Sequence, residues 1–348
     1  MLDIPVIPAT KNYWLVRTQG GRYYSDFRRG GFIAINWDKI SIEEINELSE
    51  KELIERVKKD YPDKRKPGRT ANQLRIFNKF IKKGDLVIIT DYASSRISIG
   101  EVLEDEPYAE YIKKELIEEN RKICPFQKRK RVNWIKQLHK WELDLNLFKL
   151  MQHAQHTISS ANEYGDLIES LIHDFFIKGD EAQLVLQVKK EGKIPMSAFF
   201  PMGTEILKLA EEFSRFSKNF SFNTQDIETQ VHVSSPGKIK LAGPALMITA
   251  IGLILVGLTG GHYKINFPIV GGGLDVNMNS LVREVSDFLD QQQIRKQQEM
   301  ILRTYMENLD VRTPEELTSL LKAIETQNGS DNQQKDAEEK NEASDKTE

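Results

Sequence analysis

One stretch of 21 residues, LAGPALMITAIGLILVGLTGG at positions 241–261, contains no charged residue, although charged residues make up 29% of the chain. A helix rises 1.5 Å per residue, so a helix of this length would span roughly 30 Å, the thickness of the hydrocarbon core of a bilayer. Gly257 and Gly261 form one G-x-x-x-G pair, a spacing that lets helices approach closely in lipid. These features predict a membrane-spanning segment within residues 236–264.

A second interpretation of the same stretch stays open. Pro244, the many glycines and the apolar continuation INFPIVGGGL all argue against a single span. The part ALMITAIGLILVGLT is rich in Ile, Leu and Val and is bounded by glycines, which also suits two buried strands, or a helix and a strand, inside an α/β layer. Such a layer needs cover on both faces, which an oligomer could supply.

The start of the chain and its cysteine content favour a reducing compartment. Asp3, Pro5 and Pro8 interrupt the first apolar residues, whereas a signal peptide keeps an unbroken apolar run. Cys124 is the only cysteine, which excludes an internal disulfide framework and suits a structural role. We therefore expect a cytoplasmic N-terminal domain, associated with the inner membrane through the hydrophobic segment.

Positive charge gathers in the first two-fifths of the chain. Residues 1–140 contain 29 Lys and Arg against 21 Asp and Glu, although the whole chain has a net charge of −3. The excess lies in KRKPGR at 64–69 and in QKRKRVNWIKQLHKW at 127–141, and such runs attract phosphates through counterion release. A solvated basic loop would explain them equally well. The predicted contacts to a nucleic-acid backbone are Lys64, Arg65, Arg69, Lys128, Arg129, Lys130 and Arg131.

The pattern of residues 1–150 predicts a small α+β or barrel-like domain. Apolar and aromatic runs bounded by turn residues are typical of strands, and the Gly-rich stretch GGRYYSDFRRGG is typical of a turn. Ser41 and Glu44 form a capping box at the start of a run with near-helical apolar spacing. The expected strands cover residues 12–19, 30–37, 82–92, 95–105 and 128–136, and the expected helices cover residues 41–61 and 70–81.

Four segments of this region carry a resemblance to a known domain: YWLVRTQGGRYYSDFRRGGFIAINW, TANQLRIFNKFIKKGDLVIITDY, RISIGEV and RKRVNWI. Through them residues 1–140 resemble the N-terminal domain found ahead of Mrr-type restriction endonucleases, which is similar to the EVE and YTH domains of the PUA-like superfamily. The resemblance implies a small β-barrel flanked by helices, with an aromatic-lined pocket for one flipped, often modified, base. Such a base needs an aromatic face for stacking and polar groups for its Watson–Crick edge. By position in these segments, the implied base-binding residues are Asn36, Trp37, Asn72, Tyr92, Arg96 and Trp134.

Each of these residues also has a purely structural interpretation. The tryptophans suit the core of a small domain. The two asparagines suit turn and cap positions, and Arg96 suits an ordinary surface position. The base pocket is therefore a hypothesis about the set of residues rather than about any one of them.

Residues 151–235 predict a small α/β region, in which a nuclease is the alternative function to consider. A nuclease of the Mrr type needs an acidic residue and a Gln/Glu-x-Lys pair on adjacent strands, so that carboxylates hold Mg²⁺ and the lysine orients the attacking water. The sequence LQVKK offers Gln187 and Lys189, with Asp174 or Asp180 upstream. The glycine-rich acidic segment expected before the strand is missing, and both residues also suit the polar face of an alternating strand.

The remaining sequence predicts structure more than chemistry. His153 and His156 lie three residues apart without an accompanying Cys or carboxylate cluster, so neither a metal site nor a cofactor is expected, except Mg²⁺ under the nuclease alternative. The VGGGLD segment at 270–275 suits a flexible turn. Residues 265–326 are expected to form helices of a kind that commonly self-associates, which favours a homo-oligomer. The polar tail at 327–348 is expected to be disordered.

The expected fold class is α+β, with a PUA/EVE-like small β-barrel and helices over residues 1–150 followed by four further parts. These are the small α/β region over 151–235, the hydrophobic segment over 236–264, the helical region over 265–326 and the tail over 327–348. The expected function is a non-catalytic sensor or adaptor, placed by analogy in prokaryotic antiphage defence, which binds a modified base or nucleotide and associates with membrane. The alternatives are a modification-dependent Mrr-like DNA endonuclease and a soluble oligomeric nucleic-acid-binding protein.

Overall fold

The chain forms two compact units in the computed structural model. We call Thr10–Ile172 the N-terminal unit, and Met1–Ala9 together with His173–Glu348 the C-terminal unit. The boundary at residue 172 divides the predicted α/β region, and the predicted hydrophobic and helical parts share one unit. The tail at 327–348 lies outside the described residues. The structure describes residues 4–143, 145–153, 156–190, 196–232, 237–260, 273–290, 296–315 and 317–318.

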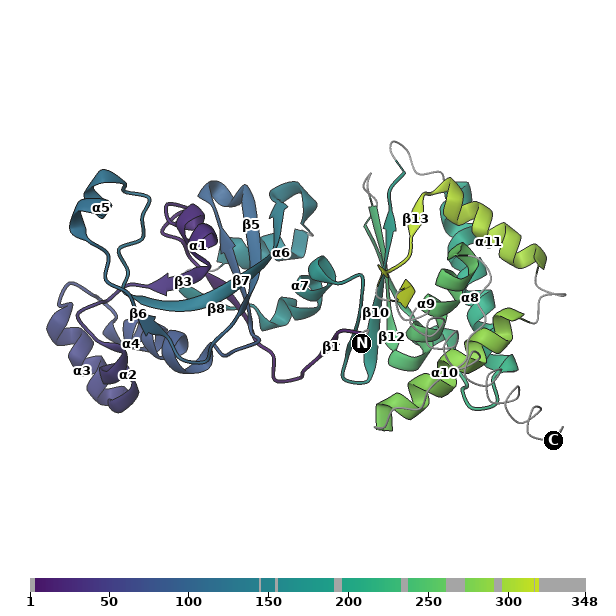
Figure 1. Cartoon of the computed structure of the whole chain (residues 1–348), viewed down its shortest axis with the longest axis horizontal. Coiled ribbons are helices and arrows are strands. Elements are labelled where there is room, and N and C mark those ends of the chain that lie inside the picture. Colours follow the sequence, from purple (N-terminus) through teal and green to yellow (C-terminus); the bar gives the residue numbers. More distant parts are fainter. Residues whose placement is uncertain are drawn as a thin grey trace, which may run out of the picture. The chain divides into compact units, whose positions relative to one another are not determined.

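The N-terminal unit is built on a seven-stranded mixed sheet (Figure 1) in the order β3-β7-β5-β4-β2-β8, and β6 pairs with β7. Strands β2 and β4 run parallel, and the other pairs run antiparallel. Within the described residues the two end strands, β3 and β8, do not pair with each other, so the sheet stays open where a small β-barrel was expected. The strands are β2 Tyr13–Val16, β3 Phe32–Ile35, β4 Leu86–Thr90, β5 Arg96–Val102, β6 Tyr108–Ala109, β7 Lys128–His139 and β8 Ile158–Ser160.

The central parallel pair explains why its apolar runs show no alternation with polar residues. Tyr13 and Leu15 of β2 pack in one apolar cluster, whereas Trp14 and Val16 pack in a second cluster. Strand β4 divides its side chains between the same two clusters. Both faces of these strands are therefore covered, and strands covered on both faces consist of continuous apolar residues.

The K-G-D-L-V segment fixes the start of β4. Gly84 adopts φ +87°, in the left-handed region that favours glycine. The buried carboxylate of Asp85 accepts hydrogen bonds from the backbone N–H groups of Asn12 (3.0 Å) and Lys82 (2.9 Å) and from Trp14 Nε1 (2.8 Å). Because a buried carboxylate needs such donors, this segment ties β2 to β4 and serves the fold.

The helices of the N-terminal unit differ from expectation in two places. Residues 41–61 form two helices rather than one, because Ser49 begins a second capping box with Glu52; the predicted box of Ser41 and Glu44 is confirmed. Helix α1 occupies the Gly-rich stretch that was expected to be a turn. The helices are α1 Tyr24–Gly30, α2 Ile42–Glu47, α3 Glu50–Asp60, α4 Pro67–Arg75, η1 Ile76–Phe80, η2 Tyr92–Ser94, α5 Lys114–Glu119, η3 Lys140–Glu142, α6 Leu145–His153, η4 Asn162–Tyr164 and α7 Gly165–Ile172.

The C-terminal unit contains a second sheet, in the order β1-β9-β10-β12-β11, with β13 pairing with β10. Its central strands β10 and β12 run antiparallel, with Leu184 opposite Leu241. Alternate residues of β10, including Leu184 and Leu186, enter the apolar core. The strands are β1 Val6–Ile7, β9 Phe175–Lys178, β10 Glu181–Val188, β11 Glu228–His232, β12 Gly237–Pro244 and β13 Val311–Arg312.

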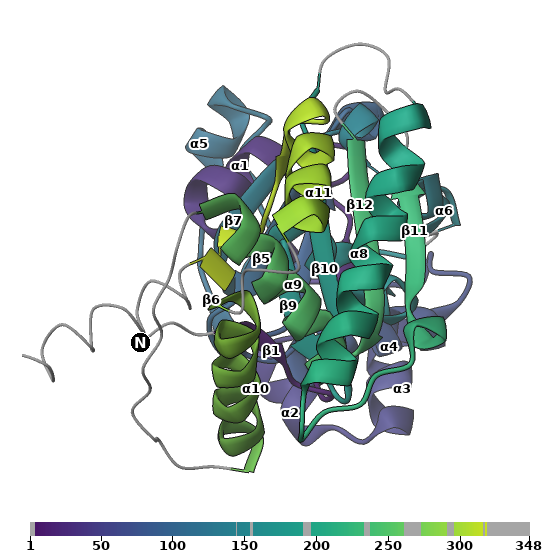
Figure 2. The same cartoon turned by 90° about the vertical axis from the view of Figure 1, so that its right-hand side faces the viewer.

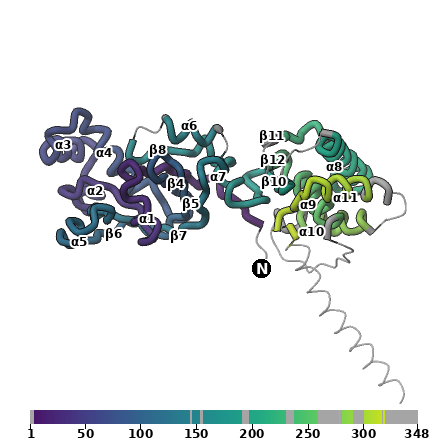
Figure 3. Tube along the Cα trace, turned by 90° about the horizontal axis from the view of Figure 1, so that it is seen from above, coloured from purple at the N-terminus to yellow at the C-terminus, as the bar shows by residue number. Residues whose placement is uncertain are grey.

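The four helices α8, α9, α10 and α11 lie on one face of this sheet (Figures 1 and 2). Helix α9 is the central element, since it contacts β10, β12 and each of the other three helices. Figure 3 shows the same grouping from above. The bounds are α8 Met196–Phe216, α9 Ala245–Gly260, α10 Gly273–Asp290 and α11 Lys296–Asn308.

The prediction of a membrane-spanning segment is wrong. Residues 241–244 belong to strand β12, so only the 16 residues of α9 remain for a helix, which gives roughly 24 Å. Within the described part of the chain, no helix combines the length and the apolar character that crossing a membrane requires. Helix α9 is apolar on all sides because the sheet covers one side and the other three helices cover the rest.

The glycines of this stretch serve helix packing inside the protein. A Cβ atom at Gly257 would lie 2.5 Å from Leu289 Cδ1 of α10, and one at Gly252 would lie 2.3 Å from Leu317 Cδ1. At both glycines a leucine side chain from another segment occupies the space beside the helix backbone, and a Cβ there would require that leucine to shift. The fold class is mixed α/β, and the apolar stretch is the core of its second unit.

Candidate functional site

A pocket of about 430 Å³ opens at the carboxyl ends of the parallel strands β2 and β4. In open sheets with parallel strands, ligands commonly bind beyond these ends, where the connecting loops diverge. Two loops form most of the wall, one following β2 and one following β4, and Met151 of α6 adds a third side. The lining residues are Leu15, Arg17, Thr18, Gly20, Gly21, Thr90, Asp91, Tyr92, Ala93, Ser94 and Met151.

Both loops have left-handed backbone conformations. Gln19, Gly20 and Gly21 follow one another with φ of +55°, +66° and +92°, and Ala93 and Ser94 both have φ of +53°. A non-glycine residue in this region costs free energy and persists only where the surrounding structure holds it, which is common at ligand sites. Three such residues beside one pocket make this part of the N-terminal unit the candidate site.

Close packing joins the two loops. A Cβ atom at Gly21 would lie 2.2 Å from the backbone nitrogen of Tyr92, so only glycine allows this approach. The Thr18 hydroxyl donates a hydrogen bond of 2.6 Å to the Thr90 carbonyl. The pocket wall is thus held in place from both sides.

The pocket presents hydrogen-bond donors and an aromatic ring. Among the described residues, no acceptor is found for the backbone N–H groups of Gly20, Gly21, Tyr92 and Ala93, all of which line the pocket. The side chain of Tyr92 is 79% exposed, so its ring is open to contact with a ligand. Arg17 adds an exposed guanidinium to the lining. Such a site can stack a planar ring and hydrogen-bond carbonyl or anionic oxygens.

An ion pair fixes the loop that carries Tyr92. Asp91 accepts hydrogen bonds from the Arg96 backbone N–H (2.7 Å) and Nε (2.8 Å) and from the Ser95 hydroxyl (3.0 Å). Burial by itself raises the pKa of the Asp91 carboxyl, but these hydrogen bonds outweigh it, so that the pKa lies below its ordinary value. Asp91 therefore stays charged at neutral pH and acts as the anchor of the loop.

The predicted base-binding residues divide between two ends of the sheet. Tyr92 lines the pocket and Arg96 holds it through Asp91. Arg96 pairs with His139 at the end of β7, whereas Ile35, just before Asn36 and Trp37, pairs with Lys128 at its start. About 36 Å of strand separates these positions at roughly 3.3 Å per residue. Neither Asn36 nor Trp37 lines the pocket.

The other predicted base-binding residues make structural contacts. Trp37 is half-buried between two apolar clusters, with φ +70°, and its N–H is bonded to the Asn36 side chain at 2.6 Å. Trp134 packs on the core of the unit, and its Nε1 donates to the Phe27 carbonyl at 2.9 Å. Asn72 is exposed within α4 rather than at the start of a helix. The structural interpretation therefore describes the two tryptophans better than the base-binding one.

Three of the four basic residues at 128–131 are buried, which corrects their interpretation as phosphate contacts. Lys128 Nζ donates to Asp38 Oδ1 (3.0 Å) and to the carbonyls of Trp37 and Ile40. Burial lowers the pKa of Lys128, and the Asp38 carboxylate partly restores it. Lysine stems bury readily, but a buried ammonium needs acceptors of this kind.

The next two basic residues are likewise used inside the fold. Arg129 lies over the Phe32 ring at 4.0 Å and bonds Glu110 at 3.0 Å. Lys130 donates to the Ile81 carbonyl at 2.8 Å and also to the Asp105 carbonyl, and burial lowers its pKa to about 8. Arg131 is the exposed member of the run.

Lys64, Arg65 and Arg69 are exposed, as a contact surface for phosphates requires. Lys64 and Arg65 lie between α3 and α4, and Arg69 lies in the first turns of α4. Gln73 follows Arg69 by one helical turn, and its side chain accepts the Ile158 N–H at 2.6 Å. Ile158 of β8 lies opposite Val16, the last residue of β2, so Gln73 lies near the pocket end of the sheet.

Of the two acidic residues offered for the nuclease alternative, Asp174 contacts Gln187 and Asp180 does not. Asp180 precedes β10 and Gln187 lies near its far end, about 23 Å away along the strand. Asp174 is closer, since its Oδ1 accepts a hydrogen bond of 2.6 Å from Gln187 Nε2. Lys189 is exposed just beyond the strand. In the described ranges, no group of three His, Cys, Asp or Glu side chains is arranged to hold a metal ion.

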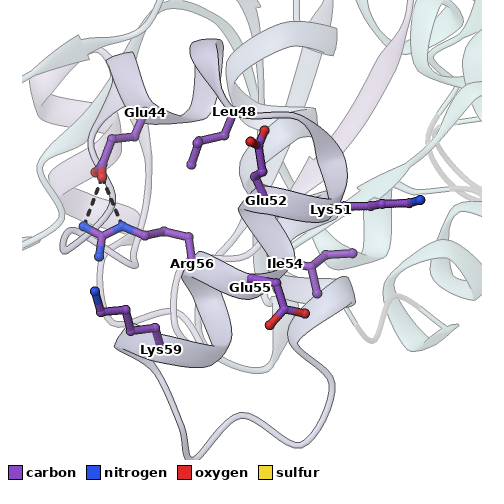
Figure 4. A pocket seen from close by; sticks show the side chains of 8 residues that line it. All are labelled: Glu44, Leu48, Lys51, Glu52, Ile54, Glu55, Arg56 and Lys59. Carbon is purple, nitrogen blue, oxygen red and sulfur yellow. Dashed lines mark hydrogen bonds and ion pairs between the residues drawn. The ribbon is translucent and has the colours of Figure 1, made fainter.

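A second hollow lies over helices α2 and α3 (Figure 4). Two of its charged side chains are paired, since Arg56 bonds Glu44 at 3.0 Å and also Asp60, outside the lining, at 2.9 Å. The hollow presents mixed charge and no exposed aromatic ring. It offers less to a ligand than the pocket beyond β2 and β4.

Comparison with known proteins gives one match. A family model described as "Domain of unknown function (DUF8426)" matches residues 13–162, which include β2 to β8 and every residue that lines the pocket. No curated protein and no solved structure matches the chain. The match therefore outlines the N-terminal unit without assigning it an activity.

Sequence reasoning missed the loop after β2. The segment R-T-Q-G-G follows an apolar strand directly, and paired glycines at such a position indicate a left-handed backbone or a close approach. That signal was available at Gly20 and Gly21. The strain at Ala93 and Ser94 had no equivalent signal, because neither residue type favours positive φ.

Proposed function

We propose that the N-terminal unit binds nucleic acid by taking one unpaired or extruded base into the pocket beyond β2 and β4. In the sensor or adaptor expected from the sequence, this unit supplies the recognition. The observation that carries the proposal is the combination of the exposed Tyr92 ring with backbone N–H groups from two facing loops.

The chemistry of a base fits these groups. Every base has a π face that stacks on an aromatic side chain, and such stacking tolerates any sequence. The backbone N–H groups of Gly20, Gly21 and Ala93 suit the carbonyl oxygens of a base or the oxygens of an adjoining phosphate. The exposed cations Lys64, Arg65 and Arg69 supply the sequence-independent attraction to the backbone.

The test is a binding titration of the full-length protein with fluorescein-labelled 12-nucleotide single-stranded DNA and RNA of mixed sequence, followed by anisotropy at fixed salt. Tyr92→Ala is expected to weaken binding about tenfold, because base–aromatic stacking is worth about 1–3 kcal/mol. Tyr111→Ala is the matched control, since Tyr111 is 78% exposed and lies next to β6, at the opposite end of β7. Equal affinities for the wild type and both variants would refute the pocket.

The identity of the base follows from the same assay. Oligonucleotides that differ only in one central base, plain or methylated, compete for the labelled strand. A pocket that reads the base gives different competition constants, and Tyr92→Ala removes the difference. A pocket that only stacks the base gives the same competition constant for every oligonucleotide.

A further inference from the structure

A second exposed aromatic group lies beside the loop that carries Tyr92. The rings of His139 and Trp141 stack with centroids 4.3 Å apart and planes within 6°. Trp141 is 76% exposed and His139 is exposed as well. We call this pair the His139–Trp141 platform. The indole stacks on the imidazole and is otherwise open, so a further flat group can contact it.

Hydrogen bonds tie the platform to the pocket loop. The Lys140 N–H donates to the Ser95 carbonyl at 3.0 Å, and the Ser95 N–H donates to the Tyr92 carbonyl. Arg96 lies opposite His139 in the β5–β7 pairing. The same chain segment continues into α6, whose Met151 lines the pocket. The platform therefore lies on a segment that is hydrogen-bonded to the pocket loop.

Both signs of charge lie around the platform: Arg96 pairs with Asp91, and the Glu142 carboxylate accepts a hydrogen bond of 2.6 Å from the His139 N–H. Arg96 and Lys140 are exposed cations on either side of the hydrogen bond that joins the two loops. Lys140 Nζ lies 5.2 Å from the centroid of the Phe148 ring of α6. Exposed aromatic rings in series with cations are the pattern that binds single strands, with successive bases on successive rings.

We propose that the His139–Trp141 platform stacks the base next to the one in the pocket, so that the ligand is a single-stranded polynucleotide of at least two nucleotides and not a free nucleotide. The inference rests on the proposed base pocket and adds its ligand class. Tyr92 then contacts one base and Trp141 a neighbour, and Arg96 and Lys140 lie near the phosphates between them.

The test compares two labelled 12-nucleotide DNA strands, one of mixed sequence and one in which all bases except a central one are replaced by abasic sites. Both strands keep the same phosphates, so their difference isolates the neighbouring bases. Trp141→Ala in the full-length protein is expected to weaken binding of the mixed strand about tenfold and to leave the single-base strand unchanged. Trp141→Phe, which retains a stacking ring, is expected to restore most of the affinity.

Each remaining outcome decides between the two proposals. If Tyr92→Ala weakens both strands while Trp141→Ala weakens neither, the pocket stands and the platform is refuted. If Trp141→Ala weakens both strands equally, the residue supports the pocket and does not stack a second base, which also refutes the inference. If neither variant differs from Tyr111→Ala, the proposed function itself fails.

Discussion

Gly21 is the position where one added methyl group should disturb the candidate site most. An alanine there must adopt φ +92°, which costs about 1–2 kcal/mol for an L-residue. Its Cβ would also meet the backbone of Asp91 and Tyr92 at 2.2–2.6 Å, and relieving such overpacking costs about 1–3 kcal/mol. The free energy of unfolding should therefore fall by about 2–5 kcal/mol in Gly21→Ala, and the pocket loops should separate.

Gly20→Ala is the matched control for this substitution. Gly20 has φ +66°, but a Cβ there meets nothing within 4 Å, so only the conformational cost of about 1–2 kcal/mol applies. All four tryptophans, at positions 14, 37, 134 and 141, belong to the N-terminal unit, so tryptophan fluorescence during urea unfolding of the full chain reports on that unit. Gly21→Ala should be clearly less stable than Gly20→Ala and should lose affinity for the 12-nucleotide strands. Equal stability and unchanged binding would refute the contact between the loops.

Three further predictions concern buried groups. Burial lowers the pKa of Lys130 in the folded protein to about 8, so between about pH 8 and 10.5 the unfolded chain binds more protons than the folded chain. Across this window the unfolding free energy of the wild type, relative to Lys130→Met, should therefore rise by up to about 3 kcal/mol. A difference that does not change with pH in urea titrations would contradict this. Glu169 Oε1 and Lys11 Nζ form an ion pair at 2.8 Å, and both side chains are mostly buried. Glu169→Gln removes the negative charge of this pair, so the free energy of unfolding, followed by fluorescence, should fall by about 3–5 kcal/mol. A fall of less than about 1 kcal/mol, as for a surface pair, would contradict this. Leu253 is fully buried in the middle of α9, so Leu253→Ala should lower the free energy of unfolding of the C-terminal unit by about 2–5 kcal/mol. Calorimetry should show a lower transition temperature, while the transition detected by tryptophan fluorescence stays unchanged.

Much of the N-terminal fold follows from local sequence signals. Strands β2 and β4 consist of continuous apolar residues, and such runs persist in a sheet that is covered on both faces. The capping box of Ser41 and Glu44 starts α2 as expected, because its two reciprocal hydrogen bonds are local. Ser49 and Glu52 form a second capping box with the same pattern. This box starts helix α3, so residues 41–61 form two helices although their apolar spacing continues through both.

The apolar stretch could not be assigned from its own residues. Lipid and a protein core present the same chemistry to Leu and Ile side chains, so composition does not distinguish them. The difference lies in residues 241–244, which extend strand β12, and in helices that come from elsewhere in the chain. Leu289 and Leu317 fill the spaces beside two glycines of α9, and no local pattern encodes that contact.

The candidate site was foreseen only in part. Tyr92 and Arg96 follow from their place in the β4–β5 turn, and both belong to the pocket or its support. The basic run at 128–131 misled, because Lys128 and Lys130 donate to backbone carbonyls, and Lys128 also to the Asp38 carboxylate, 25 to 91 positions away in the sequence. Long-range contacts of this kind decide whether a lysine faces solvent, and the run of charges alone does not.

Photo-crosslinking measures directly whether a base enters the pocket between the loops that follow β2 and β4. Full-length protein is mixed with a 12-nucleotide strand that carries one 4-thiothymidine, irradiated at long wavelength and digested for mass spectrometry. If the base enters the pocket, crosslinks form within residues 17–21 and 91–95 and are lost in Tyr92→Ala. Crosslinks confined to the segment around Trp37, or to the C-terminal unit, would contradict it.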